Sequence, residues 1–263
     1  MNSRAWNGVL ALAAWIILGI SPVFANDDAL TFRALTQLLR IDPDFTYPDR
    51  NSVSPDGRHL YAIMSSSGTI LTFSRDRNDG TLEYLRSTDL PGEDPDPRRM
   101  VLSPDGRFIY LTATGLTGNS DGVISLARNP ISGGLLLKDI FQGILFPNTL
   151  TSRPDLIAIS PDGKNLYVHM LTYTQYGLTV LSVNSETGHM EFVQQILHTG
   201  QFVDGFSESP TLEVSADGKN VYIGDGSGGN IAIYARDAAT GMLSHIGFVT
   251  LDTGRPSLGP VPS

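Results

Sequence analysis

Short apolar segments separated by turn-forming residues run through most of this chain. One stretch reads Met100-Val101-Leu102, then Phe108-Ile109-Tyr110, then Val123 to Ala127, and then Leu135 to Ile140. Glycine, proline or aspartate lies between successive segments. Apolar segments of this length, bounded by such residues, are typical of β-strands. The pattern therefore predicts an all-β fold with four strands in each unit and no long helices.

The tetrapeptide Ser-Pro-Asp-Gly marks the same point in every unit. It begins at Ser54, Ser103 and Ser160, and a fourth copy with alanine in place of proline begins at Ser215. The copies are 49, 57 and 55 residues apart, and a basic residue and then a tyrosine follow each one. Proline fixes φ at the first corner, aspartate accepts hydrogen bonds from nearby amides, and glycine adopts a positive φ. Each copy therefore predicts a hairpin turn between the first and second strands of its unit.

A four-stranded sheet repeated about every 50 residues, with apolar residues on both faces, cannot bury itself alone. It must stack against its neighbours, as the blades of a β-propeller do around a central channel. We place four blades at residues 50–90, 98–141, 153–198 and 209–251, within one domain that spans residues 26–263.

The repeat resembles that of the lactonase-type seven-bladed propellers. The features that carry the resemblance are Ser-Pro-Asp-Gly-Lys/Arg-x-Leu-Tyr, an apolar strand ending in Arg-Asp, and a turn such as Ala239-Thr240-Gly241. This family includes bacterial 6-phosphogluconolactonase, fungal carboxymuconate cyclase and YVTN-like exported propellers, whose repeats are similar to WD40 repeats. The resemblance covers about residues 51–249. It implies the fold more strongly than it implies an activity.

Pieces of further blades lie toward both ends of the chain. Residues 29–37 read like the outermost strand of a blade, and residues 254–258 read like the start of another. Four complete blades leave three possibilities. They close into a small ring, they form an open arc that needs a partner, or the gene is truncated. We favour an incomplete propeller of the seven-bladed type, whose exposed edges favour self-association.

The first 25 residues differ from the rest of the chain. One charge, at Arg4, precedes an apolar run from Gly8 to Ile20, and small residues at Val23 and Ala25 fit a signal peptidase site. We interpret residues 1–25 as a cleavable secretory signal. The alternative, a retained anchor, is disfavoured because the run is shorter than the roughly 20 residues that span a bilayer. We therefore expect a secreted protein, periplasmic or extracellular, with no membrane span after removal of the signal.

Charge and cysteine content narrow the choice of partners. The formal net charge of −9 disfavours nucleic acid and anionic lipid. The chain has no cysteine, which excludes disulfides, thiolate metal sites and a cysteine nucleophile. We expect neither a metal nor a cofactor. The partners that we consider are a protein, a glycan or a small anionic ligand.

Propellers bind ligands at the mouth of the channel, on loops that join the outer strand of one blade to the inner strand of the next. The candidate ligand-binding residues on these loops are Arg98, Arg99, Arg153, Asp155 and Arg255. The candidate catalytic residues are Arg99, Arg153, His198 and Glu208. Lactone hydrolysis needs a base that activates water and a cation that holds an anionic substrate, and these residue types meet that need.

Two functions of different classes remain open. Enzymes of the family that this chain resembles commonly carry Pro-Arg-His ahead of the inner strand, with the histidine near the reaction centre. The matching residues are Pro97-Arg98-Arg99, so His198 or His169 would have to replace that histidine. This departure favours an exported module that binds a partner without catalysis. The alternative is a lactonase-like hydrolase of the 6-phosphogluconolactonase type, which acts on an anionic lactone at the channel mouth.

Overall fold

Four antiparallel sheets of four strands each make up the described part of the computed structural model, which covers residues 50–118, 120–142, 153–171, 176–198, 211–224 and 230–250. Blade 1 consists of β1 (Arg50–Val53), β2 (His59–Met64), β3 (Thr69–Arg75) and β4 (Leu82–Asp89). Blade 2 consists of β5 (Asp96–Leu102), β6 (Phe108–Leu116), β7 (Ser120–Arg128) and β8 (Leu135–Gln142). Blade 3 consists of β9 (Arg153–Ile159), β10 (Asn165–Leu171), β11 (Tyr176–Val183) and β12 (Met190–His198). Blade 4 consists of β13 (Thr211–Val214), β14 (Asn220–Gly224), β15 (Asn230–Arg236) and β16 (Leu243–Thr250).

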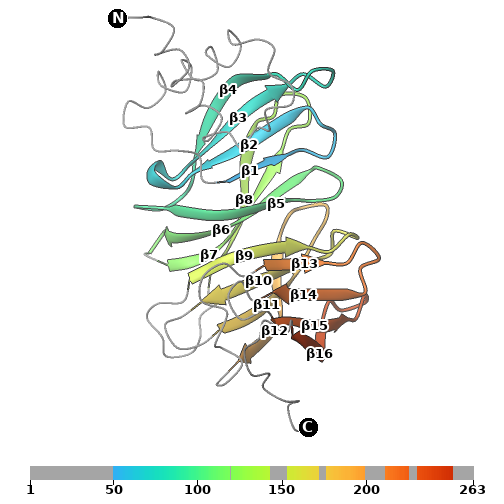
Figure 1. Ribbon diagram of the computed structural model, residues 1–263. Coiled ribbons are helices and arrows are strands. Elements are labelled where there is room, and N and C mark those ends of the chain that lie inside the picture. The colour runs from blue at the N-terminus through green and yellow to red at the C-terminus, as the bar shows by residue number, and fades with distance from the viewer. Residues whose placement is uncertain are drawn as a thin grey trace, which may run out of the picture.

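Each sheet keeps its strands in chain order, so every blade is a simple meander. The blades follow one another along the molecule in chain order, from blade 1 to blade 4 (Figure 1). The first strand of each blade lies beside the first strand of the next, which makes β1, β5, β9 and β13 the inner strands. This arrangement confirms the predicted β-propeller architecture. A short 3-10 turn, η2 (Ser65–Ser67), joins β2 to β3, and no helix in the described ranges is long and apolar enough to cross a bilayer.

Several predicted features fall outside the described residues. They are the signal at residues 1–25, the additional strand at residues 29–37 and the start of a further blade at residues 254–258.

The hydrophobic core lies between neighbouring blades. Tyr61 and Ile63 of blade 1 pack with Leu111 of blade 2 in one fully buried cluster. Equivalent clusters join blade 2 to blade 3 and blade 3 to blade 4, as the packing of Tyr167 against Val221 illustrates. Each sheet therefore buries its apolar face against its neighbour, as the repeat required.

The Ser-Pro-Asp-Gly segments form the predicted turns. In the first copy the amide of Gly57 donates to the Ser54 carbonyl at 2.8 Å, and Gly57 has a φ of 69°. The Ser54 hydroxyl donates to the Asp56 carboxylate at 2.6 Å, and the amide of Arg58 donates to the same carboxylate oxygen at 3.1 Å. The other three copies repeat the backbone bond and the serine–aspartate bond. Only the local sequence is needed for this geometry, so each copy forms the same turn.

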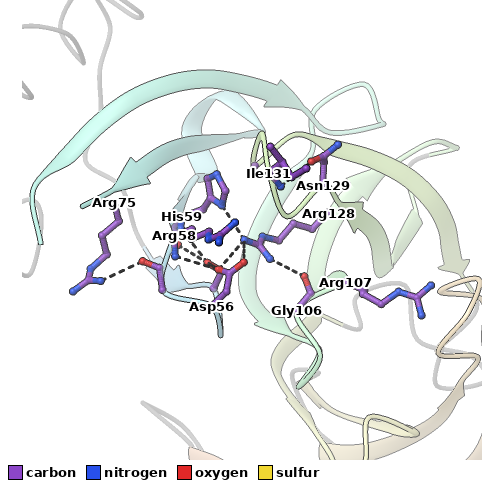
Figure 2. A network of polar contacts seen from close by, with 12 residues as sticks. Asp56, Arg58, His59, Arg75, Gly106, Arg107, Arg128, Asn129 and Ile131 are labelled. Carbon is purple, nitrogen blue, oxygen red and sulfur yellow. Dashed lines mark hydrogen bonds and ion pairs between the residues drawn. The ribbon is translucent and has the colours of Figure 1, made fainter. Parts of the chain in front are cut away.

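An arginine at the end of the third strand of blade 2 ties that blade to the turn of blade 1 (Figure 2). Arg128 Nη2 donates to both carboxylate oxygens of Asp56, at 2.9 and 2.8 Å, and contacts His59 Nδ1 at 2.8 Å. Its Nε donates to the Tyr61 hydroxyl at 2.9 Å, and its Nη1 donates to the Gly106 carbonyl in its own blade at 3.0 Å. We call this contact the arginine clamp.

The same clamp joins blades 3 and 4. Arg236 Nη2 donates to Asp162 at 3.0 and 2.8 Å and to Asn165 Oδ1 at 2.7 Å, and its Nε donates to the Tyr167 hydroxyl at 2.8 Å. Its Nη1 donates to the Gly218 carbonyl at 3.1 Å. The side chain of Arg236 is only 2% exposed. Hydrogen bonds therefore satisfy all three nitrogen atoms of a buried cation, which makes the clamp a specific contact between blades.

The contact between blades 2 and 3 lacks this clamp, because Val183 occupies the position of the arginine. The hydroxyl of Tyr110, which is equivalent to Tyr61 and Tyr167, is buried without a hydrogen-bond partner among the described residues. An exposed ion pair from Arg107 to Glu186, 3.4 Å long, lies at this contact instead. Exposed pairs of this kind contribute little to stability.

Candidate functional site

The candidate residues that the structure describes lie at the beginnings of two neighbouring inner strands. Arg98 and Arg99 are near the start of β5, and Arg153 and Asp155 are at the start of β9. Because β5 and β9 lie side by side, the propeller brings two segments more than 50 residues apart to adjoining positions on the inner side of the molecule.

Strand register shows which of these residues are equivalent. The pairing of β5 with β6 shifts between Pro97 and Arg99, so Arg98 lies at a bulge, and the pairing of β9 with β10 skips Asp155 in the same way. Arg99 lies opposite Thr112 in blade 2, and the equivalent pair in blade 3 is Leu156 opposite His169. Bulges re-aim side chains next to functional sites. Arg98 and Asp155 therefore occupy matching, irregular positions.

Two charged side chains pair at the beginning of blade 2. Arg98 Nη2 donates to Asp96 Oδ2 at 2.7 Å, and the two side chains are 23% and 41% exposed. The Nε of Arg98 is buried and has no hydrogen-bond partner within the described part of the chain. Arg98 also acts electrostatically on Asp121, at the start of β7. A partly buried guanidinium thus pairs with Asp96, and its charge acts on Asp121 on the third strand of the same blade.

Asp121 is the carboxyl in this group whose pKa is perturbed. Burial raises the pKa of Asp121, and the backbone amide of Gly115 and the charge of Arg98 offset only part of this rise. A carboxylate of raised pKa beside a cation is a candidate general base. Sequence reasoning missed Asp121, because nothing in the local sequence distinguishes it from other polar residues that flank a hairpin.

Close packing around the connection from blade 1 to blade 2 fixes the position of Asp96 and Arg98. The amide of Leu90 donates to the Gly68 carbonyl at 3.0 Å, and the Ser65 hydroxyl donates to the Pro97 carbonyl at 2.7 Å. Gly115 has a φ of +67°, and a side chain there would collide with the backbone carbonyl of Asp94. Gly115 therefore allows the connection to lie directly on the β6–β7 hairpin.

The remaining candidates are less well placed or lie outside the described residues. The side chain of Arg153 is exposed, and neither Arg99 nor Arg153 has a hydrogen-bond partner for its guanidinium among the described residues. His169 is only 2% exposed, which argues against direct contact with a substrate. His198 ends β12, but its side chain is not described, and Glu208 and Arg255 lie outside the described ranges. Within those ranges no group of three or more histidine, aspartate or glutamate residues is placed to hold a metal ion.

Comparison with known proteins identifies the family. A family model described as a lactonase, seven-bladed β-propeller matches residues 22–148 and 146–256. The chain belongs to this lactonase family.

Its relatives are longer than this lactonase-family chain. The 6-phosphogluconolactonase of Bacillus subtilis (strain 168) is 26% identical over 187 residues, which cover 71% of this chain and 50% of that protein. A structure from Lactobacillus plantarum has a TM-score of 0.62 at 24% identity, and the match covers 78% of this chain and 55% of the other. A Bacteroides uniformis protein, named as a candidate 6-phosphogluconolactonase, has the same TM-score, identity and coverage. The chain therefore spans about half the length of these relatives.

These comparisons bear on the two functions left open by the sequence. They support the lactonase alternative better than the non-catalytic binding module. The solved structures with a matching fold bear on the fold alone, because their identity to this chain is low. A specific reaction must therefore be argued from the charged side chains of blade 2, which are Asp96, Arg98 and Asp121.

Proposed function

We propose that this chain hydrolyses an anionic lactone of the sugar-acid type at the inner end of blade 2. The observation that carries the proposal is the Asp121 carboxyl, whose pKa is raised by burial and which lies within the electrostatic reach of Arg98 in a lactonase-family propeller. Membership of the family and the curated relative named 6-phosphogluconolactonase support the substrate class.

The residues present can perform each step of the reaction. The Asp121 carboxylate accepts a proton from water, and the water oxygen attacks the lactone carbonyl carbon. The guanidinium of Arg98, which also pairs with Asp96, donates to the oxyanion that forms at that carbonyl. When the tetrahedral intermediate collapses, the ring C–O bond breaks, and the protonated Asp121 returns its proton to the leaving oxygen.

Two further arginines supply affinity for the anion. Arg99 and Arg153, on neighbouring inner strands, carry guanidinium groups without partners among the described residues. Guanidinium groups pair well with phosphate or carboxylate. We expect Arg99→Ala and Arg153→Ala to raise KM for a phosphorylated lactone and to leave KM for its unphosphorylated counterpart almost unchanged.

Enzyme-dependent hydrolysis of 6-phosphogluconolactone, corrected for spontaneous ring opening, tests the proposal. We expect Asp121→Asn to lower kcat by about 10²–10⁴-fold, because the amide cannot accept the proton from water. Glu83→Gln, an exposed carboxylate-to-amide change on the outer strand β4, is the matched control and should keep full activity. An active protein that is indifferent to Asp121→Asn would refute the assignment of the base, and a protein without activity would favour the binding module.

A further inference from the structure

Two carboxylates of blade 2 compete for the guanidinium of Arg98. Arg98 Nη2 donates to Oδ2 of Asp96, which lies two residues earlier on β5, at 2.7 Å. The charge of Arg98 also acts on Asp121, near the start of β7, but no ion pair joins these two side chains in the part of the chain that the structure describes. Asp96 is therefore the carboxylate that holds Arg98.

The backbone that carries Asp96 is packed from both sides. On the blade 1 side, Gly68 has a φ of +62°, and a side chain at Gly68 would collide with Pro95. On the other side, a side chain at Gly92 would collide with the carbonyl oxygen of Gly115, near the end of β6. The connection from blade 1 to blade 2 thus has little room to shift. The Asp96 carboxylate is therefore a fixed anchor for the longer side chain of Arg98.

Blade 3 carries the same segment with its charges exchanged. Residues 96–98 read Asp-Pro-Arg and residues 153–155 read Arg-Pro-Asp, and in both segments the third residue is skipped in the pairing with the next strand. The aspartate and the arginine form an ion pair in blade 2, whereas Arg153 and Asp155 form none among the described residues. The bulged backbone alone therefore does not produce the ion pair, which is a particular feature of blade 2.

Arg98 is the charged side chain to which Asp121 responds. Burial raises the pKa of Asp121, and among the described residues Arg98 is the one charged group with a resolved effect on it, which is to lower it. A direct ion pair with Arg98 would lower this pKa further and make Asp121 a weaker base. It would also occupy the donor that the lactone oxyanion needs. The other charged residues on the neighbouring elements are Glu93, Asp94, Asp96 and Arg99 at the beginning of blade 2, Lys138 and Asp139 on β8, and Arg153 and Asp155 on β9.

We propose that Asp96 is a positioning residue of this site: it holds the guanidinium of Arg98 toward the lactone carbonyl and prevents it from pairing with the Asp121 carboxylate. This role of Asp96 rests on the hydrolysis proposed above. The cation and the base then have separate roles, because Arg98 stabilises the oxyanion while Asp121 stays free to take the proton from water. Asp96 acts through Arg98 and does not need to contact the substrate.

The pH dependence of 6-phosphogluconolactone hydrolysis tests this role. Asp96→Asn releases Arg98, whose charge then stabilises the Asp121 carboxylate, so the pKa of Asp121 falls and the acid limb of the kcat/KM profile moves to lower pH. On the plateau, kcat/KM should fall about tenfold to hundredfold, because the guanidinium is displaced from the oxyanion. Asp96→Glu keeps the charge and should restore the original acid limb. Glu93→Gln removes an exposed carboxylate from the same connection and should leave both the acid limb and the rate unchanged.

Direct titration of Asp121 separates this role from the proposed function. Carbon-13 NMR of aspartate-labelled protein follows the Asp121 carboxyl, with Asp121→Asn to assign its signal and near-UV circular dichroism to verify folding. We expect the midpoint of that titration to fall in Asp96→Asn and to stay unchanged in Glu93→Gln. An unchanged midpoint in Asp96→Asn would overturn the role of Asp96, as would a loss of activity without any movement of the acid limb. A midpoint that falls in a protein without lactonase activity would support the contact between Asp96 and Arg98 and would refute the hydrolysis alone.

Discussion

Replacing the clamp tyrosines by phenylalanine measures what the clamp hydrogen bonds contribute to the free energy of unfolding, apart from the packing of the rings. Tyr61→Phe removes the bond from the tyrosine hydroxyl to the Gly133 carbonyl, 3.1 Å long, and the bond from Arg128 Nε, 2.9 Å long. The Arg128 side chain is only 1% exposed, so its Nε–H would remain buried without an acceptor. Leaving such a group unsatisfied costs about 1–3 kcal/mol. Tyr167→Phe should cost about as much, because its two bonds are 3.2 and 2.8 Å long.

Tyr110→Phe is the matched control, because the Tyr110 hydroxyl contacts no clamp arginine among the described residues and has only a weak interaction with Ser125. Burial raises the pKa of Tyr110 well above its usual value, as expected for a poorly solvated hydroxyl. We expect Tyr110→Phe to change the free energy of unfolding by less than about 0.5 kcal/mol, or to stabilise the protein slightly.

Thermal and urea unfolding at one fixed protein concentration measure the stability of all three variants. A cost of about 2 kcal/mol should lower Tm by roughly 4–8 °C in a chain of this size and should shift the urea midpoint without changing the m-value. Equal destabilisation by Tyr61→Phe and Tyr110→Phe would refute the reasoning, as would a neutral Tyr61→Phe.

Two further predictions concern the clamps. Because arginine only donates, His59 must accept from Arg128 as a neutral ring. Burial, and then the charge of Arg128, lower the pKa of His59 in the folded protein. The stability that neutral His59 contributes is therefore complete above the unfolded pKa of about 6.5 and is lost as pH falls below that value. His59→Asn, which copies Asn165 of the second clamp, should flatten stability below that pH in urea titrations, whereas an unchanged pH dependence would contradict this assignment. Val183→Arg should build a third clamp with Asp105 and raise Tm, and a large loss of stability would show that this contact cannot accept one.

The sequence was sufficient for the architecture because the signals that specify it are local. A Ser-Pro-Asp-Gly turn is stabilised by hydrogen bonds within its own few residues, and the regular spacing of the four copies predicts four sheets. The role of Asp56 as an acceptor for Arg128 was missed, because the two residues are 72 positions apart and meet only when blades stack. A signal was nevertheless present: arginine ends the third strand at positions 75, 128 and 236, and Val183 is the exception.

The candidate site was predicted in part for the same reason. Arg98 and Arg153 could be placed at the beginnings of inner strands from the repeat alone, since each lies just ahead of an apolar segment. Asp121 could not, because the rise in its pKa comes from burial in the folded blade, which the charge of Arg98 on another strand only partly offsets. Tertiary packing of this kind leaves no periodic mark in the sequence.

The arginine clamp joins blade 1 to blade 2 and blade 3 to blade 4, so a double-mutant cycle on Asp56 and Arg128 tests its contribution most directly. Asp56→Asn, Arg128→Met and the double variant should give a coupling energy of about 1.5–3 kcal/mol in urea unfolding, the range for hydrogen bonds to charged groups. A coupling energy near zero would contradict the clamp as a contact that joins neighbouring blades.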